Sequence, residues 1–148
     1  MRERLTDFGL LWLRILVGLA LMYHGWIKVI GGMGGFEESV GKMGVPFDYA
    51  PLLFAWLSTL AELLGGFFIL LGLWTRYAAI VLSINLAIAA FVRNGGNPII
   101  QPGNVNTLEL PLTYLTITVA IFIMGAGRYS VDNSRSGGGA GGARRSKK

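Results

Sequence analysis

Residues 52–73 read LLFAWLSTLAELLGGFFILLGL, an almost uninterrupted apolar stretch with a single carboxylate, Glu62, near its middle. At 1.5 Å per residue, a helix of this length crosses the roughly 30 Å hydrocarbon core of a bilayer. A carboxylate at that depth costs about 2.5–3.5 kcal/mol on insertion scales, so it usually faces protein or water and has a partner. We therefore expect other helices to supply a partner for Glu62.

The composition of the whole chain also indicates a membrane protein. The 148 residues are 53% hydrophobic and only 14% charged, and the mean hydropathy of +0.55 is too high for an ordinary soluble domain. The sequence contains no cysteine and one histidine, which excludes iron–sulfur clusters, thiolate metal sites and bis-histidine haem carried by this chain. We therefore expect no metal site.

Two loops rich in Gly, Pro and Asn, and a short connection at Thr75-Arg76, divide the chain into four apolar segments. Their ranges are 8–30, 52–73, 77–92 and 108–124. Because each span needs about 20 residues, the length leaves no room for a separate soluble domain. We predict an all-α membrane domain over 1–131, an antiparallel four-helix transmembrane bundle, followed by a disordered, glycine-rich basic tail over 132–148.

The distribution of Lys and Arg beside the spans predicts the orientation. Basic residues gather at both termini and in the connection that contains Arg76, whereas the loops over 31–51 and 93–107 hold fewer of them. Since cytoplasmic loops carry the excess of Lys and Arg, both termini are predicted to be cytoplasmic.

Three basic residues lie on one side of the first predicted helix. Arg14, His24 and Lys28 fall within an arc of roughly 120° on a helical wheel. Depth estimated at 1.5 Å per residue brings the Glu62 carboxylate within side-chain reach of the levels of both Arg14 and His24. We predict a buried Arg14–Glu62 pair, in which His24, Lys28 or Asn85 completes the hydrogen bonds.

Other residues are candidates for the same polar interior. Glu109 begins a face of the fourth span that we expect to point inward. Tyr23, Trp26 and Trp56 lie near one predicted boundary, where they are typical of an aromatic belt and could also line a pocket for a flat ring. A buried ion pair can also serve only to fix helix register, so a structural and a functional interpretation both stay open.

Three stretches of this sequence resemble the DoxX family of small four-helix membrane proteins. They are LRILVGLALMYHGWIKVIGG (13–32), FEESVGKMGVP (36–46) and AELLGGFFILLGLWTRYAAIVLSINLAIA (61–89). The resemblance implies a bacterial or archaeal plasma-membrane protein, with relatives linked to quinone-coupled oxidation of sulfur compounds or to oxidant defence. Family membership specifies fold and location far more closely than chemistry.

Together these observations lead to a functional hypothesis. The chain is expected to be a membrane subunit of redox metabolism that binds a quinone-like or small apolar ligand between its helices, at most one subunit of a quinone-linked oxidoreductase. Glu62 and His24 would handle protons, while Arg14 and Lys28 would stabilise negative charge on a ring oxygen. The alternative is a non-enzymatic scaffold or a small-solute transporter with the same polar residues.

The expected partners follow from the same composition. Without cysteine or a nucleotide-binding fingerprint, electrons must come from protein partners in a membrane redox complex or from a bound cofactor, of which quinone is the candidate. Beyond the lipid bilayer, a homo-oligomer stays open. The basic tail lacks interleaved aromatic residues, so no nucleic acid is expected as a partner.

Overall fold

The computed structural model describes residues 2–96, 98–99 and 108–136, and every regular element in these ranges is helical. The elements are α1 (Arg2–Ile30), α2 (Met33–Gly41), the 3-10 turn η1 (Phe47–Tyr49), α3 (Pro51–Leu71), α4 (Thr75–Ala87), the π-helix η2 (Ile88–Arg93), α5 (Glu109–Met124) and α6 (Val131–Ser136). The predicted all-α class is confirmed for this part of the chain.

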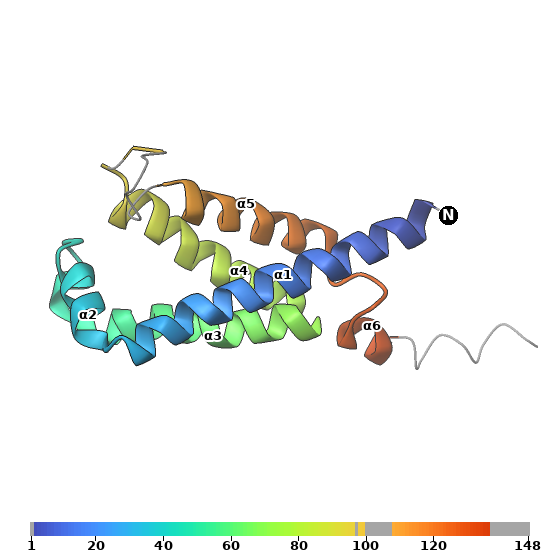
Figure 1. The fold of residues 1–148 in the computed structure, drawn as a ribbon, viewed down its shortest axis with the longest axis horizontal. Helices are drawn as coiled ribbons and strands as arrows, with labels where there is room; N and C mark the ends of the chain where they lie inside the picture. The colour runs from blue at the N-terminus through green and yellow to red at the C-terminus, as the bar shows by residue number, and fades with distance from the viewer. Residues whose placement is uncertain (1, 97, 100–107, 137–148) are drawn as a thin grey trace, which may run out of the picture.

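Three of the helical stretches are long and apolar enough to cross a membrane, namely Arg4–Ile30, Pro51–Leu71 and Thr75–Arg93. The fourth apolar helix, Glu109–Met124, is shorter. Figure 1 shows the long helices running back and forth, with α1 against α3 and α4 beside α5. The N-terminus and α6 lie at one end of the molecule, and α2 lies at the other.

Glycine residues bring α1 and α3 into close contact. A Cβ atom on Gly18 would lie 2.8 Å from the carbonyl oxygen of Gly66, and one on Gly66 would lie 2.8 Å from the carbonyl oxygen of Gly18. A Cβ on Gly25 would lie 2.8 Å from Leu63. Because neither backbone can yield without moving its helix, these contacts fix the register of the two helices.

Local sequence explains where α3 begins and ends. Pro51 occupies the first turn, where its missing N–H costs nothing. Gly72 adopts φ of 67°, and its amide donates to Ile69 while the amide of Leu73 donates to the carbonyl oxygen of Phe68 at 3.0 Å. This left-handed cap satisfies the last carbonyls of the helix and turns the chain directly into α4.

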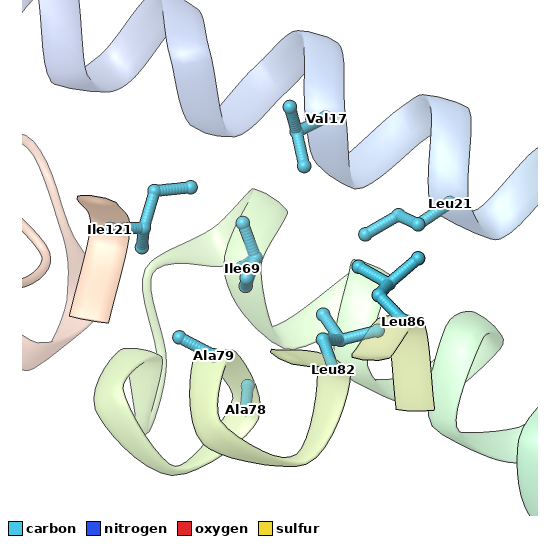
Figure 2. Packing of buried hydrophobic residues seen from close by; sticks show 8 residues of the cluster. All are labelled: Val17, Leu21, Ile69, Ala78, Ala79, Leu82, Leu86 and Ile121. Atoms are coloured by element: carbon cyan, nitrogen blue, oxygen red, sulfur yellow. The ribbon is translucent and has the colours of Figure 1, made fainter. Parts of the chain in front are cut away.

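The buried core joins all four long helices. Figure 2 shows Val17 and Leu21 from α1 facing side chains of the other helices; the remaining members are Ile69, Ala78, Ala79, Leu82, Leu86 and Ile121. Large apolar side chains also cover the outer surface, including Leu16, which is 61% exposed, and Ile123, which is 68% exposed. An outer surface of this kind suits a lipid environment rather than water.

The fourth apolar helix turns a different face inward from the one predicted. Glu109, Thr113 and Thr116 are exposed, and the two threonine hydroxyls donate to carbonyls one turn earlier at 2.8 and 2.9 Å. The buried residues are Thr118 and Ile121. At about 100° per residue, Glu109 lies on the opposite side of the helix from Thr118. The expectation that Glu109 points inward is therefore wrong.

The first residues of the predicted tail belong to the helix α6, Val131–Ser136, and are not disordered. The Asp132 carboxylate accepts hydrogen bonds from the Trp74 amide at 2.8 Å and from the Thr75 amide and hydroxyl at 2.9 Å each. These bonds cap α4 and hold α6 in place. The prediction of a disordered tail over 132–148 is wrong for residues of α6, and 137–148 lie outside the described residues.

Candidate functional site

A cavity of about 310 Å³ lies between α2, α3, α4 and η2. Figure 1 shows α2 at the end of the molecule away from the N-terminus. Apolar side chains form most of its wall, among them Phe36 and Val40 from α2, Leu57 from α3 and Ile84 from α4. The charged and amide groups on the wall are Lys28, Glu62, Asn85 and Arg93, with the Ser58 hydroxyl beside them. The cavity is thus an apolar space with a compact polar group.

Lys28 and Glu62 form the centre of this polar group. Lys28 Nζ donates to Glu62 Oε1 at 2.7 Å and lies 2.7 Å from Oε2 as well. Asn85 Nδ2 donates to the same Oε1 at 3.3 Å, and Ser58 Oγ lies 3.5 Å from Nζ. Oε2 is buried in the ion pair and accepts no hydrogen bond from any described residue. The predicted need of Glu62 for a basic partner is therefore met by Lys28.

Arg14 has a different set of partners from the one predicted. Its guanidinium is 1% exposed and donates from Nε to the carbonyl oxygen of Ile69 at 3.1 Å, from Nη2 to that of Tyr129 at 2.9 Å, and from Nη1 to that of Ala126. These carbonyls belong to the C-terminal turn of α3 and to the connection between α5 and α6. A cation at a helix C-terminus also interacts favourably with the helix dipole.

The register of α1 and α3 explains why the predicted Arg14–Glu62 pair is wrong. Gly18 lies opposite Gly66 and Gly25 opposite Leu63, so Glu62 is level with Gly25 and its neighbours. Arg14 is about ten residues, or about 15 Å, further along α1. The depth estimate from sequence placed the two residues too close because it could not include this register.

His24 lies outside the cavity wall. Its ring is 5.7 Å from the ring of Tyr114 in α5, with the two planes at 72°, and 6.4 Å from the ring of Tyr23. His24 thus sits at the same level as Glu62 but faces α5 rather than the space between α3 and α4. The structure does not bring the two candidate proton-handling residues together around one cavity.

The aromatic candidates lie on the outer surface. Tyr23, Trp26 and Trp56 are 61%, 55% and 39% exposed, and none of the three lies on the cavity wall. Their positions agree with the aromatic-belt interpretation and not with a pocket for a flat ring. Of the predicted polar residues, the structure brings together Lys28, Glu62 and Asn85.

Two residues of the site were missed by sequence reasoning. One is Phe36, whose ring is close to two cations, with Lys28 Nζ 4.3 Å and Arg93 Cζ 5.2 Å from its centre. The other is Arg93 itself. Arg93 Nε also donates to Ser39 Oγ at 3.1 Å. Phe36, Val40 and Met43 are spaced at intervals of four and three residues, which is typical of one apolar helix face. This spacing is the sequence signal that could have predicted a contribution of residues 36–43 to the cavity wall.

The π-helix explains why Arg93 reaches the cavity. Over Ile88–Arg93 the backbone widens, and the amide of Asn94 donates to the carbonyl oxygen of Ala89, five residues earlier, at 3.1 Å. Ile88, Ala89 and Arg93 all contribute to the wall. Short π-helices occur frequently at functional sites, because they change the direction of side chains within a helix.

Several wall residues are also on the outer surface. Leu57, Val81 and Ile84 are 53%, 51% and 57% exposed although they line the cavity. The cavity therefore opens between α3 and α4 onto the apolar face of the molecule. A molecule dissolved in lipid tails could enter it from the side.

Apolar helices of membrane-spanning length around a cavity with a buried ion pair define a multi-pass helical membrane protein. The chain belongs to the DoxX family, whose model matches residues 9–95. The matched range contains every residue of the cavity wall.

Two relatives match nearly the whole chain. An uncharacterised protein of Haemophilus influenzae is 32% identical over 137 residues, which cover 88% of this chain and 93% of that protein. The inner membrane protein YqjF of Escherichia coli is 32% identical over 133 residues, which cover 88% of this chain and 94% of that protein. No solved structure matches. The predicted family and the multi-pass plasma-membrane location are confirmed.

Proposed function

We propose that this chain binds a small, mostly apolar, quinone-like ligand in the cavity beside Lys28 and Glu62, as a subunit of redox metabolism that works with partner proteins. The observation that carries the proposal is the combination of an apolar cavity and one buried ion pair in its wall. A volume of about 310 Å³ is at the lower end of the range for small-molecule sites, so one ring system is the expected content.

The side opening supports a ligand that arrives through the lipid. Quinone-like molecules dissolve in hydrocarbon, and the exposed rim residues Leu57, Val81 and Ile84 present only apolar atoms to them. Inside, Lys28 can donate a hydrogen bond to a ring oxygen and Glu62 can accept a proton. Arg14 and His24, for which the sequence suggested similar roles, have other partners and are left out of this chemistry.

Electrons would come from elsewhere. The chain has no cysteine, and the described residues contain no cluster of His, Asp and Glu that could hold a metal ion. Protein partners or a bound cofactor would therefore supply or remove electrons, and the ligand would connect them to the bilayer. The exposed apolar faces leave room for such partners or for a second copy of the chain.

A titration of the purified protein with menadione, followed by tryptophan fluorescence in a nonionic detergent, tests the proposal. The wild type should show saturable binding. Ala61→Phe places a ring inside the cavity and should abolish it, whereas Leu60→Phe, on the lipid-facing side of the same turn, should leave it unchanged. Absence of saturable binding to the wild type with its partners present would remove the proposal.

A non-enzymatic scaffold is the second candidate, and the contacts of Arg14 favour it. The buried guanidinium of Arg14 donates to backbone carbonyls, which supports an architectural use of charge in this chain. If Lys28 and Glu62 served the same purpose, the wild type would show no saturable binding of menadione. Filling the cavity with Ala61→Phe would then leave the assembly with partners unchanged.

We also propose four spans with both termini in the cytoplasm. The α1 N-terminus, Arg76, Arg128 and Arg135 belong to the same end of the molecule, and the positive-inside rule assigns that end to the cytoplasm. Reporter fusions after Gly96 and after Arg135 should report the outside and the cytoplasm respectively. The opposite result for either fusion would overturn this topology.

A further inference from the structure

The charges on the cavity wall do not balance. Two cations, Lys28 and Arg93, and one carboxylate, Glu62, line it in the described part of the chain. The ion pair at 2.7 Å neutralises Lys28. Arg93 forms no ion pair with any described residue, so the cavity carries one excess positive charge.

The guanidinium of Arg93 has unused hydrogen-bond donors. An arginine side chain carries five N–H donors in a planar fork. One of them, on Nε, donates to Ser39 Oγ at 3.1 Å, and no other hydrogen bond joins this guanidinium to the described residues. Phe36 supports the group from one side, with its ring centre 5.2 Å from Cζ. Arg93 is thus held at the cavity with most of its donors available.

The apolar wall of the cavity strengthens the attraction between this excess positive charge and an anionic ligand. Electrostatic attraction grows as the surroundings become less polarisable, and the wall here is mostly apolar. Arg93 is an exposed residue, so its free donors can bind water when no ligand is present. An anionic oxygen at the mouth of the cavity would instead accept a charge-assisted hydrogen bond, roughly twice as strong as a neutral one. Lys28 adds a second positive group on the same wall.

We infer that the preferred ligand of this cavity is a flat apolar ring that carries one negatively charged oxygen, an enolate or a phenolate. The inference rests on the proposed function, since it specifies the ligand class of the same site. Arg93, on the π-helix, is the residue that selects the charge, and the Lys28–Glu62 pair lies deeper between α1 and α3.

Two naphthoquinones of similar size separate the charge preference from quinone binding itself. Lawsone carries an enol that is ionised at neutral pH, and menadione carries a methyl group instead. Wild-type protein in a nonionic detergent should bind lawsone about tenfold more tightly than menadione, the ratio that one charge-assisted hydrogen bond supplies. The preference should shrink when the pH falls below the pKa of the enol.

Arg93→Gln should reduce the ratio of the lawsone and menadione affinities to near one, mainly by weakening the binding of lawsone. Arg93→Lys, which keeps the charge but loses the planar fork, should retain part of the preference. Arg76→Gln removes the same charge from an exposed position at the other end of the molecule and should leave the ratio unchanged.

The outcomes are distinct. Equal affinities in the wild type, or a ratio that Arg93→Gln leaves intact, would overturn the charge preference while quinone binding stands. Equal loss of both ligands in Arg93→Gln would assign Arg93 to packing and would also overturn it. If neither ligand binds the wild type, the proposed function fails first.

Discussion

Lys28 Nζ lies 2.7 Å from both carboxylate oxygens of Glu62, and this ion pair joins α1 to α3 in the wall of the cavity. The two side chains are only 17% and 8% exposed. In such surroundings an unpaired charge is costly, so each residue depends on the other. The pair therefore both holds two helices together and supplies the polar end of an otherwise apolar site.

The first prediction concerns this pair. Lys28→Met and Glu62→Leu alone should each destabilise the protein by about 3–5 kcal/mol, because each strands a buried charge. The double variant should recover most of the loss. Thermal unfolding in detergent for the four proteins measures the coupling, and losses that simply add would show that the residues act independently.

The second prediction concerns the close contact of α1 and α3. Gly66→Ala should destabilise the protein by about 1–3 kcal/mol, because its new Cβ would lie 2.8 Å from the Gly18 carbonyl oxygen and the helices would have to separate. Gly9→Ala in α1 meets no atom within 4 Å and should be neutral or slightly stabilising. Melting temperatures in detergent compare the two, and equal effects would contradict the register described here.

The third prediction concerns Arg14. Arg14→Gln should lower stability by about 3 kcal/mol or more, since it removes charged donors from several buried carbonyls. Arg14→Lys keeps the charge but cannot reach all three acceptors, so it should retain only part of the stability that Arg14→Gln loses. Limited proteolysis should then cut the connection between α5 and α6 first. Unchanged protease resistance in Arg14→Gln would contradict the anchoring role.

The fourth prediction is a pH dependence at α6. Partial burial acts to raise the pKa of Asp132, but hydrogen bonds from the Thr75 amide and hydroxyl and from the Trp74 amide together lower it below its ordinary value. A lowered pKa in the folded state means that the contribution of Asp132 is present above the ordinary pKa and is lost as the pH falls through the folded-state pKa.

Hydrogen exchange at the Trp74 and Thr75 amides measures this effect. Protection in the wild type should fall in acid and be constant from weakly acidic to neutral pH. Asp132→Ala, which removes the acceptor, should show protection at neutral pH reduced by about 1 kcal/mol, typical of a missing helix cap, and little further change in acid. Protection in Asp132→Ala equal to the wild type at neutral pH would show that the carboxylate does not cap α4.

The sequence was sufficient for the helical class, the apolar segments and the need of Glu62 for a basic partner. These features depend on composition and on the cost of an isolated charge in lipid, both of which can be evaluated one helix at a time. Asn85 was also predicted to join the polar group, and it donates to Glu62 Oε1 at 3.3 Å.

The identity of the basic partner could not be predicted, because it depends on the register between two helices. That register comes from the backbone contact of Gly18 and Gly66, which no hydropathy pattern specifies. Arg93 was assigned to a loop because a π-helix has no simple sequence signature. The order of α6 depends on Asp132 reaching across to α4, a contact between residues that are far apart in sequence.

The central claim is that the cavity beside Lys28 and Glu62 binds a quinone-like ligand, and photolabelling with an azido-naphthoquinone tests it most directly. Mass spectrometry of the labelled protein should find the label on wall residues such as Phe36, Leu57 and Val81, and an excess of unlabelled menadione should remove it. Label spread over lipid-facing residues such as Leu16 and Ile123, and unaffected by menadione, would contradict the claim.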